Sequence, residues 1–270
     1  MDVLRASLIG VLLLSAAAHA EDISYINLPT KDLRYDPVSQ RIYASVPSRG
    51  GSLGNSIVPI DPVTGALESP IFVGSEPGKI AISDDGQALY VVLDGATSVR
   101  RVNLPARSAD LQFGTGYVED IAVMPGNPAT VAISRRAPST SPRHLGVAIF
   151  DNGVQRPITT PGHTGSNVIE FGPVGTTLYG YNNETSEFGF RKMAITPAGV
   201  AVTSVTANLL YGYSLDIAFD GGRIYATSGR VIDPEAGILL GTLTESSSHP
   251  WSSRTGRPIA CILLRAAEAW

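Results

Sequence analysis

The sequence contains a single cysteine among its 270 residues, Cys261, so no disulfide within the chain can stabilise the fold. Charged residues are also scarce, at 16% of the chain, and 24 Asp and Glu outnumber 20 Lys and Arg. A chain without a basic excess lacks the electrostatic basis for binding nucleic acid, so we expect no nucleic-acid partner. Nowhere does an apolar run approach the roughly 20 residues of a membrane-spanning helix, and we expect no membrane span.

Histidine is rare as well, and only His144, His163 and His249 follow the first 20 residues. They form no H-E-x-x-H or other paired spacing of the kind that holds zinc. No C-x-x-C-H motif is present to attach haem. We therefore predict no zinc and no haem, and no cofactor other than the Ca²⁺ considered below.

Glycine and proline, by contrast, are abundant, with 28 Gly and 19 Pro, and both interrupt helices. Short runs of Val, Ile, Thr and Tyr lie between these turn residues, which is typical of many short strands. The composition excludes a helical bundle and predicts an all-β protein.

The first twenty residues have the pattern of a secretory signal peptide. Arg5 precedes an apolar run over Leu8–Leu14, and Ala18-His19-Ala20 provides the small residues that signal peptidase requires. We therefore expect residues 1–20 to be a signal peptide cleaved after Ala20, and the mature protein to be secreted, periplasmic or held at the cell surface.

The chain beyond the leader is an internal repeat. Five short apolar strands recur at spacings of 41 to 48 residues, and each is followed by a turn of Asp, Pro or Gly and a second apolar strand. A period near 45 residues with four strands per unit is the signature of a β-propeller blade. The anchor residues of the five first strands are Leu33, Ile80, Ile121, Ile169 and Ile217.

Two further features support the repeat. The turns Asp61-Pro62-Val63-Thr64-Gly65 and Asp233-Pro234-Glu235-Ala236-Gly237 share their chemistry and their place in the unit. The second strands Leu89–Leu93 and Leu178–Tyr181 are continuously apolar, which predicts burial of both faces between neighbouring sheets.

The second unit, over Ile71–Val92, resembles the YVTN β-propeller repeat, a WD40-like family of exported and cell-surface proteins. Its residues Ser83-Asp84-Asp85-Gly86 and Leu89-Tyr90-Val91-Val92 carry the likeness, which weakens elsewhere and lacks the Tyr at Val131. The resemblance implies a propeller of four-stranded antiparallel blades, commonly seven, and says little about function because the matching residues are turn and core positions.

The repeat also predicts how the ring is built. Residues 21–245 hold five complete blades, and Ile23–Leu28 resembles an outer strand that would close a sixth blade supplied by later sequence. Residues 246–270 offer only part of such a blade, so we expect either an incomplete sixth blade, as in a truncated seven-bladed propeller, or an aberrant tail. The unpaired edges of blades one and five would then favour self-association.

Loops between second and third strands vary in length, and variable loops on one face of a repeat array often mark its binding side. The longest, Arg135–His144, is also the most cationic, and it either grips an anionic partner or is simply solvated. The predicted binding residues on this face are Arg49, Arg135, Arg136, Arg143 and His144.

Asp32, Asp120 and Asp216 precede the anchors of blades one, three and five, whereas Lys79 and Val168 occupy that position in the other two blades. A ring of carboxylates could hold Ca²⁺, although an Asp at a strand entry commonly accepts backbone N–H bonds instead. Asn183-Glu184-Thr185 is a glycosylation sequon only in a host that glycosylates. We regard Gly50-Gly51-Ser52-Leu53-Gly54 as a loop, because a hydrolase elbow needs a strand-to-helix turn.

These features predict a non-enzymatic binding or scaffolding module that contacts a protein or a glycan at the cell surface. The alternative is an enzyme, because propellers also host lactonases and quinoprotein dehydrogenases. An enzyme requires His, Glu and Arg side chains with perturbed pKa values to converge near the channel.

Overall fold

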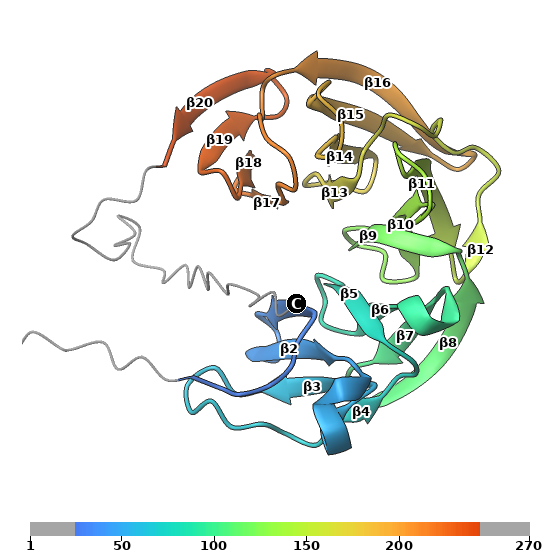
Figure 1. The fold of residues 1–270 in the computed structure, drawn as a ribbon, viewed down its shortest axis with the longest axis vertical. Helices are drawn as coiled ribbons and strands as arrows, with labels where there is room; N and C mark the ends of the chain where they lie inside the picture. The colour runs from blue at the N-terminus through green and yellow to red at the C-terminus, as the bar shows by residue number, and fades with distance from the viewer. Residues whose placement is uncertain (1–24, 244–270) are drawn as a thin grey trace, which may run out of the picture.

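The computed structural model describes residues 25–243, and the predicted signal peptide, Cys261 and the tail 246–270 lie outside that range. Twenty strands form five four-stranded antiparallel sheets, and two short 3-10 turns, η1 (Ser48–Leu53) and η2 (Asp94–Ala96), accompany them. The sheets stand like blades around a common axis, from blade 1 in blue to blade 5 in red (Figure 1). Over residues 25–243 the fold is a β-propeller with the five complete blades that the repeat predicts, and the residues of the predicted incomplete sixth blade lie outside the described range.

Each blade begins with its innermost strand and continues outward in sequence order. The strands of blades 1 and 2 are β1 (Asp32–Asp36), β2 (Arg41–Val46), β3 (Ser56–Ile60), β4 (Ile71–Phe72), β5 (Pro77–Ile82), β6 (Ala88–Leu93), β7 (Ser98–Asn103) and β8 (Ser108–Gly114). Those of blade 3 are β9 (Tyr117–Val123), β10 (Thr130–Arg136), β11 (His144–Asp151) and β12 (Val154–Gln155). Blades 4 and 5 consist of β13 (Val168–Phe171), β14 (Thr177–Tyr181), β15 (Gly189–Thr196), β16 (Gly199–Ala207), β17 (Ile217–Asp220), β18 (Arg223–Ala226), β19 (Arg230–Asp233) and β20 (Ile238–Thr242).

The core consists of apolar layers between neighbouring blades. Every residue of β6 is buried, as are Leu178–Tyr181 of β14, so the prediction of strands buried on both faces is confirmed. Tyrosines of the second strands also bond to the next blade: Tyr90 Oη donates to Pro128 O at 2.8 Å, and Tyr179 Oη donates to Glu235 Oε1 at 2.5 Å. The Tyr of the repeat therefore joins blades as well as filling the core.

The two predicted Asp-Pro turns are built identically. Asp61 Oδ1 accepts the N–H groups of Val63 and Thr64, and Asp233 Oδ1 accepts those of Glu235 and Ala236. The glycine that ends each turn has a positive φ, 70° at Gly65 and 65° at Gly237, a conformation that glycine adopts without strain.

One sequence-based expectation about elements is wrong and another stays a prediction. Residues 25–28, the described part of Ile23–Leu28, are in no strand of the described structure, and the later sequence predicted to pair with them lies outside the described residues. The cationic loop is shorter than predicted: β10 continues through Arg136 and β11 begins at His144, so Arg135, Arg136 and His144 are strand residues and only 137–143 form the loop.

Within residues 25–243, no helix is both long and apolar enough to cross a membrane.

Candidate functional site

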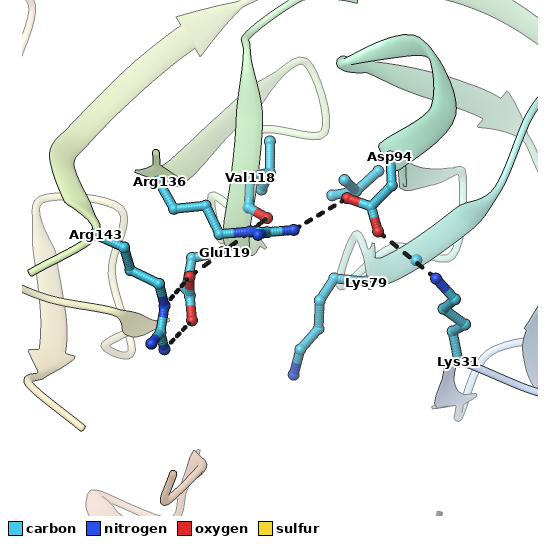
Figure 2. Close-up of a pocket in the computed structure, with 9 residues that line it drawn as sticks. Lys31, Lys79, Asp94, Val118, Glu119, Arg136 and Arg143 are labelled. Atoms are coloured by element: carbon cyan, nitrogen blue, oxygen red, sulfur yellow. Dashed lines mark hydrogen bonds and ion pairs between the residues drawn. The ribbon is translucent and has the colours of Figure 1, made fainter. Parts of the chain in front are cut away.

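The five inner strands surround the axis of the propeller, and we call the region between them the channel. A cavity of about 290 Å³ lies at the end of this region where the inner strands begin. Figure 2 shows its charged side chains converging from three blades. Four are cationic and two are acidic, and we call this cavity the mouth pocket. Its lining is Lys31, Gly78, Lys79, Val92, Asp94, Val118, Glu119, Arg136 and Arg143.

The propeller geometry accounts for this convergence. Lys31, Lys79 and Glu119 lie at or just before the start of inner strands β1, β5 and β9, and Asp94 lies in η2, which links the second and third strands of blade 2. All these positions emerge on the same face of antiparallel blades. Because Gly78 has no side chain, it leaves room for the Asp94 carboxylate: a Cβ at this position would lie 3.2 Å from Asp94 Oδ2.

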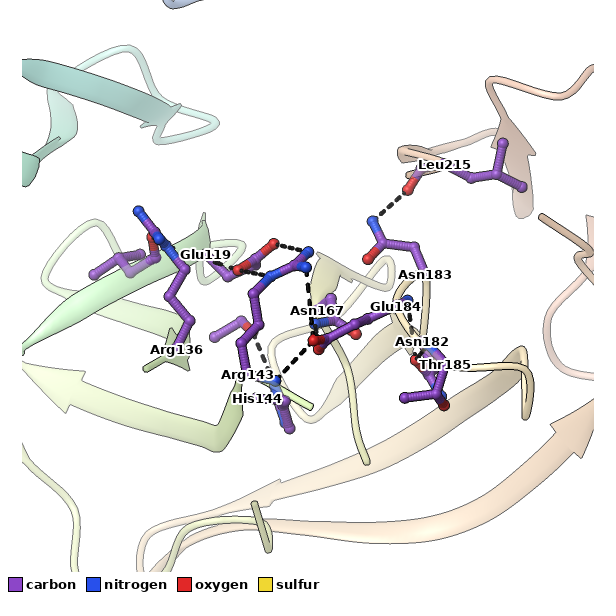
Figure 3. A network of polar contacts seen from close by, with 12 residues as sticks. Glu119, Arg136, Arg143, His144, Asn167, Asn182, Asn183, Glu184, Thr185 and Leu215 are labelled. Atoms are coloured by element: carbon purple, nitrogen blue, oxygen red, sulfur yellow. Dashed lines mark hydrogen bonds and ion pairs between the residues drawn. The ribbon is translucent and has the colours of Figure 1, made fainter. Parts of the chain in front are cut away.

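Arg143 is the most firmly held cation of the mouth pocket. Its Nε and Nη2 donate to the two carboxylate oxygens of Glu119 at 2.9 and 2.7 Å, a bidentate pair. Its backbone N–H donates to Glu184 Oε1 at 2.8 Å, and Asn167 Nδ2 donates to Glu184 Oε2 at 3.2 Å (Figure 3). Glu184 of blade 4 thus ties the blade 3 loop in place.

Arg136 and Lys31 are held more loosely. Arg136 Nη2 lies 3.5 Å from Asp94 Oδ1 and its Nε lies 3.8 Å from Glu119 Oε2, while Lys31 Nζ lies 3.9 Å from Asp94 Oδ2. All three distances exceed those between Arg143 and Glu119. The guanidinium of Arg136 also stacks 5.6 Å from the ring centroid of Tyr117, and its Nε donates to Val118 O. These two cations are positioned by the fold yet keep donors available for an incoming anion.

Of the five predicted binding residues, the structure brings only Arg136 and Arg143 to this pocket. Arg135 alternates with Arg136 along β10 and points to the opposite side, where its guanidinium donates to the carbonyls of Gly146 and Leu145. Arg49 is exposed in η1, away from the pocket lining.

His144 is buried, with 1% of its surface exposed, and does not reach the pocket. Its Nε2 accepts the backbone N–H of Ser166 at 3.3 Å. Burial, with the nearby Arg191 and Arg135, lowers the pKa of His144 to about 4, so the ring is neutral near pH 7. Its place is in the core between blades 3 and 4.

The sequon residue Asn183 is buried as well, with 8% exposed. Its Nδ2, the atom that glycosylation would modify, donates to Leu215 O at 2.8 Å (Figure 3). The native fold therefore withholds this atom from modification.

The three predicted aspartates lie at or near the starts of inner strands β1, β9 and β17, and none of them is among the residues that line the mouth pocket. Asp32 Oδ2 accepts the N–H of Ile80 at 2.9 Å, and Asp120 Oδ2 accepts that of Ile169 at 2.8 Å. In both cases the donor is the anchor residue of the next blade, so these carboxylates accept backbone N–H groups and join neighbouring blades.

Asp216 is used differently, because its Oδ2 accepts a hydrogen bond from Lys79 Nζ at 3.0 Å across the channel, from blade 2 to blade 5. Within the described part of the chain, no group of three or more His, Cys, Asp and Glu side chains is placed to hold a metal ion. The aspartates thus do not assemble there into a calcium site.

Two channel residues escaped the sequence analysis, Arg34 and Glu170. Each lies two positions beyond the site of an aspartate or its equivalent, on the same side of its inner strand. The signal was present: the corresponding position holds alanine in the other blades, at Ala81, Ala122 and Ala218. The channel cluster comprises Asp32, Arg34, Lys79, Asp120, Glu170 and Asp216.

Two acids of the channel cluster have strongly perturbed pKa values. Burial raises the pKa of Asp120 to about 7, although Lys79 and Arg34 oppose the shift. Burial likewise raises the pKa of Glu170 to about 8 against the field of Arg34. Desolvation outweighs the attraction of the cations at both sites, so a substantial protonated fraction persists at neutral pH.

Comparisons with known proteins give the fold alone. No family model matches the chain, and no curated protein sequence matches it. Among solved structures, 1245 chains match, including one of the hydrazine synthase of Kuenenia stuttgartiensis, with a TM-score of 0.61 and 19% identity. The match covers 80% of this chain and 66% of that one, so the present chain spans just under two thirds of the length of its structural neighbour.

Proposed function

We propose that this protein is a binding module that recognises an anionic group of a protein or glycan in the mouth pocket. The observation that carries the proposal is the convergence of Lys31, Lys79, Arg136 and Arg143 on one cavity. Fixed cations at a concave site favour a carboxylate or phosphate, because little conformational entropy is lost when the anion binds.

The volume of the mouth pocket and the ion pairs of its cations support the binding of one small acidic group. A volume near 290 Å³ is at the lower end of ligand sites, suited to an acidic side chain or a uronic acid residue. Asp94 lies between Lys31 and Arg136 at 3.9 and 3.5 Å, so an entering anion can compete for both cations.

The proposal includes the setting of the protein. We propose that the chain is exported, that signal peptidase cleaves after Ala20, and that the module acts outside the cell or at its surface as a propeller of the YVTN type. N-terminal sequencing of secreted protein should begin at Glu21, and retention of Met1 would contradict export by this route.

We further propose that sequence beyond blade 5 contributes part of a sixth blade.

Two neighbouring arginines test the pocket. We expect Arg136→Ser to weaken binding of polygalacturonate about tenfold, since a charge-assisted contact is lost. Arg135→Ser is the matched control, because Arg135 follows the opposite side of β10. In the methyl-esterified polymer the carboxylates carry no charge, so titrations with it distinguish recognition of the charge from recognition of the sugar. Equal affinities in the two variants would refute the assignment.

One observation favours the enzyme alternative. Asp120 and Glu170 have pKa values of about 7 and 8 beside Arg34 and Lys79, a setting that suits a general acid or base. A panel of lactones offered to the purified protein decides the matter: turnover that disappears in Glu170→Gln would establish catalysis, whereas binding without turnover leaves the module as proposed.

A further inference from the structure

Lys79 joins the mouth pocket to the channel cluster, and these two groups of side chains differ in the sign of their charge. Along an inner strand, successive residues rise about 3.3 Å, so Arg34 and Glu170 lie roughly 7 Å deeper than the first aspartate layer. Cations dominate the mouth. The four acids of the channel cluster outnumber its two cations, Arg34 and Lys79.

Lys79 belongs to both regions. It lines the mouth pocket, and its ammonium bonds to Asp216 while lying in the field of Asp120 and Asp32. The side chain of Lys79 therefore reaches from the cationic lining of the mouth pocket to the acids of the channel cluster. Glu170 and Lys79 are half-buried, so each retains exposed surface in the channel.

The channel also has unmet hydrogen-bonding capacity. Asp120 is 3% exposed, its Oδ2 is bonded to Ile169, and its Oδ1 is buried with no hydrogen-bond partner among the described residues. A buried acceptor without a donor costs free energy until a donor arrives. Glu170 adds a second acid in the same field of Arg34 and Lys79. Both acids are suited to an ammonium group.

We propose that the ligand is a zwitterion whose anionic group binds Arg136 and Lys31 in the mouth pocket while its ammonium group enters the channel to meet Asp120 and Glu170. This inference rests on the proposed anion site and adds the second charge of the ligand. It accounts for the opposite charge of the two regions, which an anion site alone leaves unexplained.

Three molecules with the same number of carbon atoms test the proposal by calorimetry at pH 7: caproate, ε-aminocaproate and hexylamine. We expect ε-aminocaproate to bind about tenfold more tightly than caproate, because charge-assisted hydrogen bonds to the channel acids are added. The isosteric pair Asp120→Asn and Glu170→Gln should remove this advantage and leave caproate unchanged. Asp110→Asn, in an exposed pair with Arg101, is the control carboxylate.

Proton release provides an independent readout. The acids face Lys79 from β5, Arg34 from β1 and Asp216 from blade 5, and an arriving ammonium favours their ionised forms. We therefore expect ε-aminocaproate to release protons on binding, seen as different heats in buffers of different ionisation enthalpy, and caproate to release none.

The outcomes separate the two proposals. If caproate and ε-aminocaproate bind equally and depend on Arg136, the anion site stands and the zwitterion inference is wrong. If neither binds, the anion site itself fails, and the inference fails with it. If hexylamine alone binds, the channel takes a simple cation and the zwitterion proposal is overturned.

Discussion

The mouth pocket and the channel cluster differ in how their carboxylates are neutralised, although only a few residues separate them. In the mouth, Glu119 is clasped by Arg143 at 2.7 Å, and Asp94 lies between two cations. In the channel, Asp120 and Glu170 form no ion pair within the described structure, and burial raises the pKa of both. The comparison teaches that burial without a direct ion pair raises the pKa of a carboxylate even where cations lie nearby.

The largest change in stability is expected when the hydrogen bond between the Ile169 N–H and Asp120 is removed. Asp120→Ala removes the acceptor of the Ile169 N–H and should lower the free energy of unfolding by about 2 to 3 kcal/mol, because a buried donor loses its partner. Asp120→Asn retains an acceptor and should be far milder. Urea unfolding at pH 8 measures both, and equal losses would show that the carboxylate charge matters more than the hydrogen bond.

The second effect is a dependence of the free energy of unfolding on pH, which arises from the channel acids and not from the mouth pocket. The folded pKa of Glu170 is about 8 and that of Asp120 about 7, both above their unfolded values, so their stabilising contribution is present at low pH and is lost as pH rises through these values. We expect the free energy of unfolding to fall by about 2 kcal/mol from pH 6.5 to 8.5.

Glu170→Gln should remove most of that slope, whereas Asp110→Asn on the outer sheet should retain it. His144 contributes little in this window: it is neutral in the folded state, with a pKa of about 4, and loss of its proton in the unfolded state, with a pKa near 6.5, raises stability by only about 0.4 kcal/mol above pH 6.5. A wild-type protein whose stability is flat from pH 6.5 to 8.5 would contradict the raised pKa values of Glu170 and Asp120.

The smallest effect concerns the mouth, where the carboxylates compete with an incoming anion. Asp94→Asn removes the acid between Lys31 and Arg136, so we expect caproate to bind about fivefold more tightly. The free energy of unfolding should change by less than about 1 kcal/mol, because these pairs are partly exposed. Weaker caproate binding in Asp94→Asn would show instead that Asp94 orients the cations.

Repetition made much of the fold predictable. Anchors such as Ile80 and Ile169, the continuous apolar run Leu89–Leu93 and the Asp-Pro turns recur at one phase, and each lies where its repeat position requires. The outer strand predicted over Ile23–Leu28 would pair with sequence beyond residue 245, which lies outside the described residues, so that expectation stays a prediction.

The site was predictable only in part. A run of arginines indicated a cationic loop, but strand alternation separates Arg135 from Arg136, and burial removes His144 from the surface. Lys31, Asp94 and Glu119 carried no signal of their own, since ordinary turn and strand-end positions acquire a shared site only when three blades meet.

By itself, the sequence determined the blade: the period, the turn chemistry and the apolar strands follow from local propensity and from the need to bury both faces of a sheet. Only the tertiary structure decided which charges meet. Lys79 and Asp216 are 137 residues apart in the chain yet their side chains are 3.0 Å apart across the channel, and the pKa of Glu170 is raised by burial in the folded protein, against the opposing field of Arg34. Closing a repeat around an axis brings equivalent positions together, and the charges at those positions then act as one site.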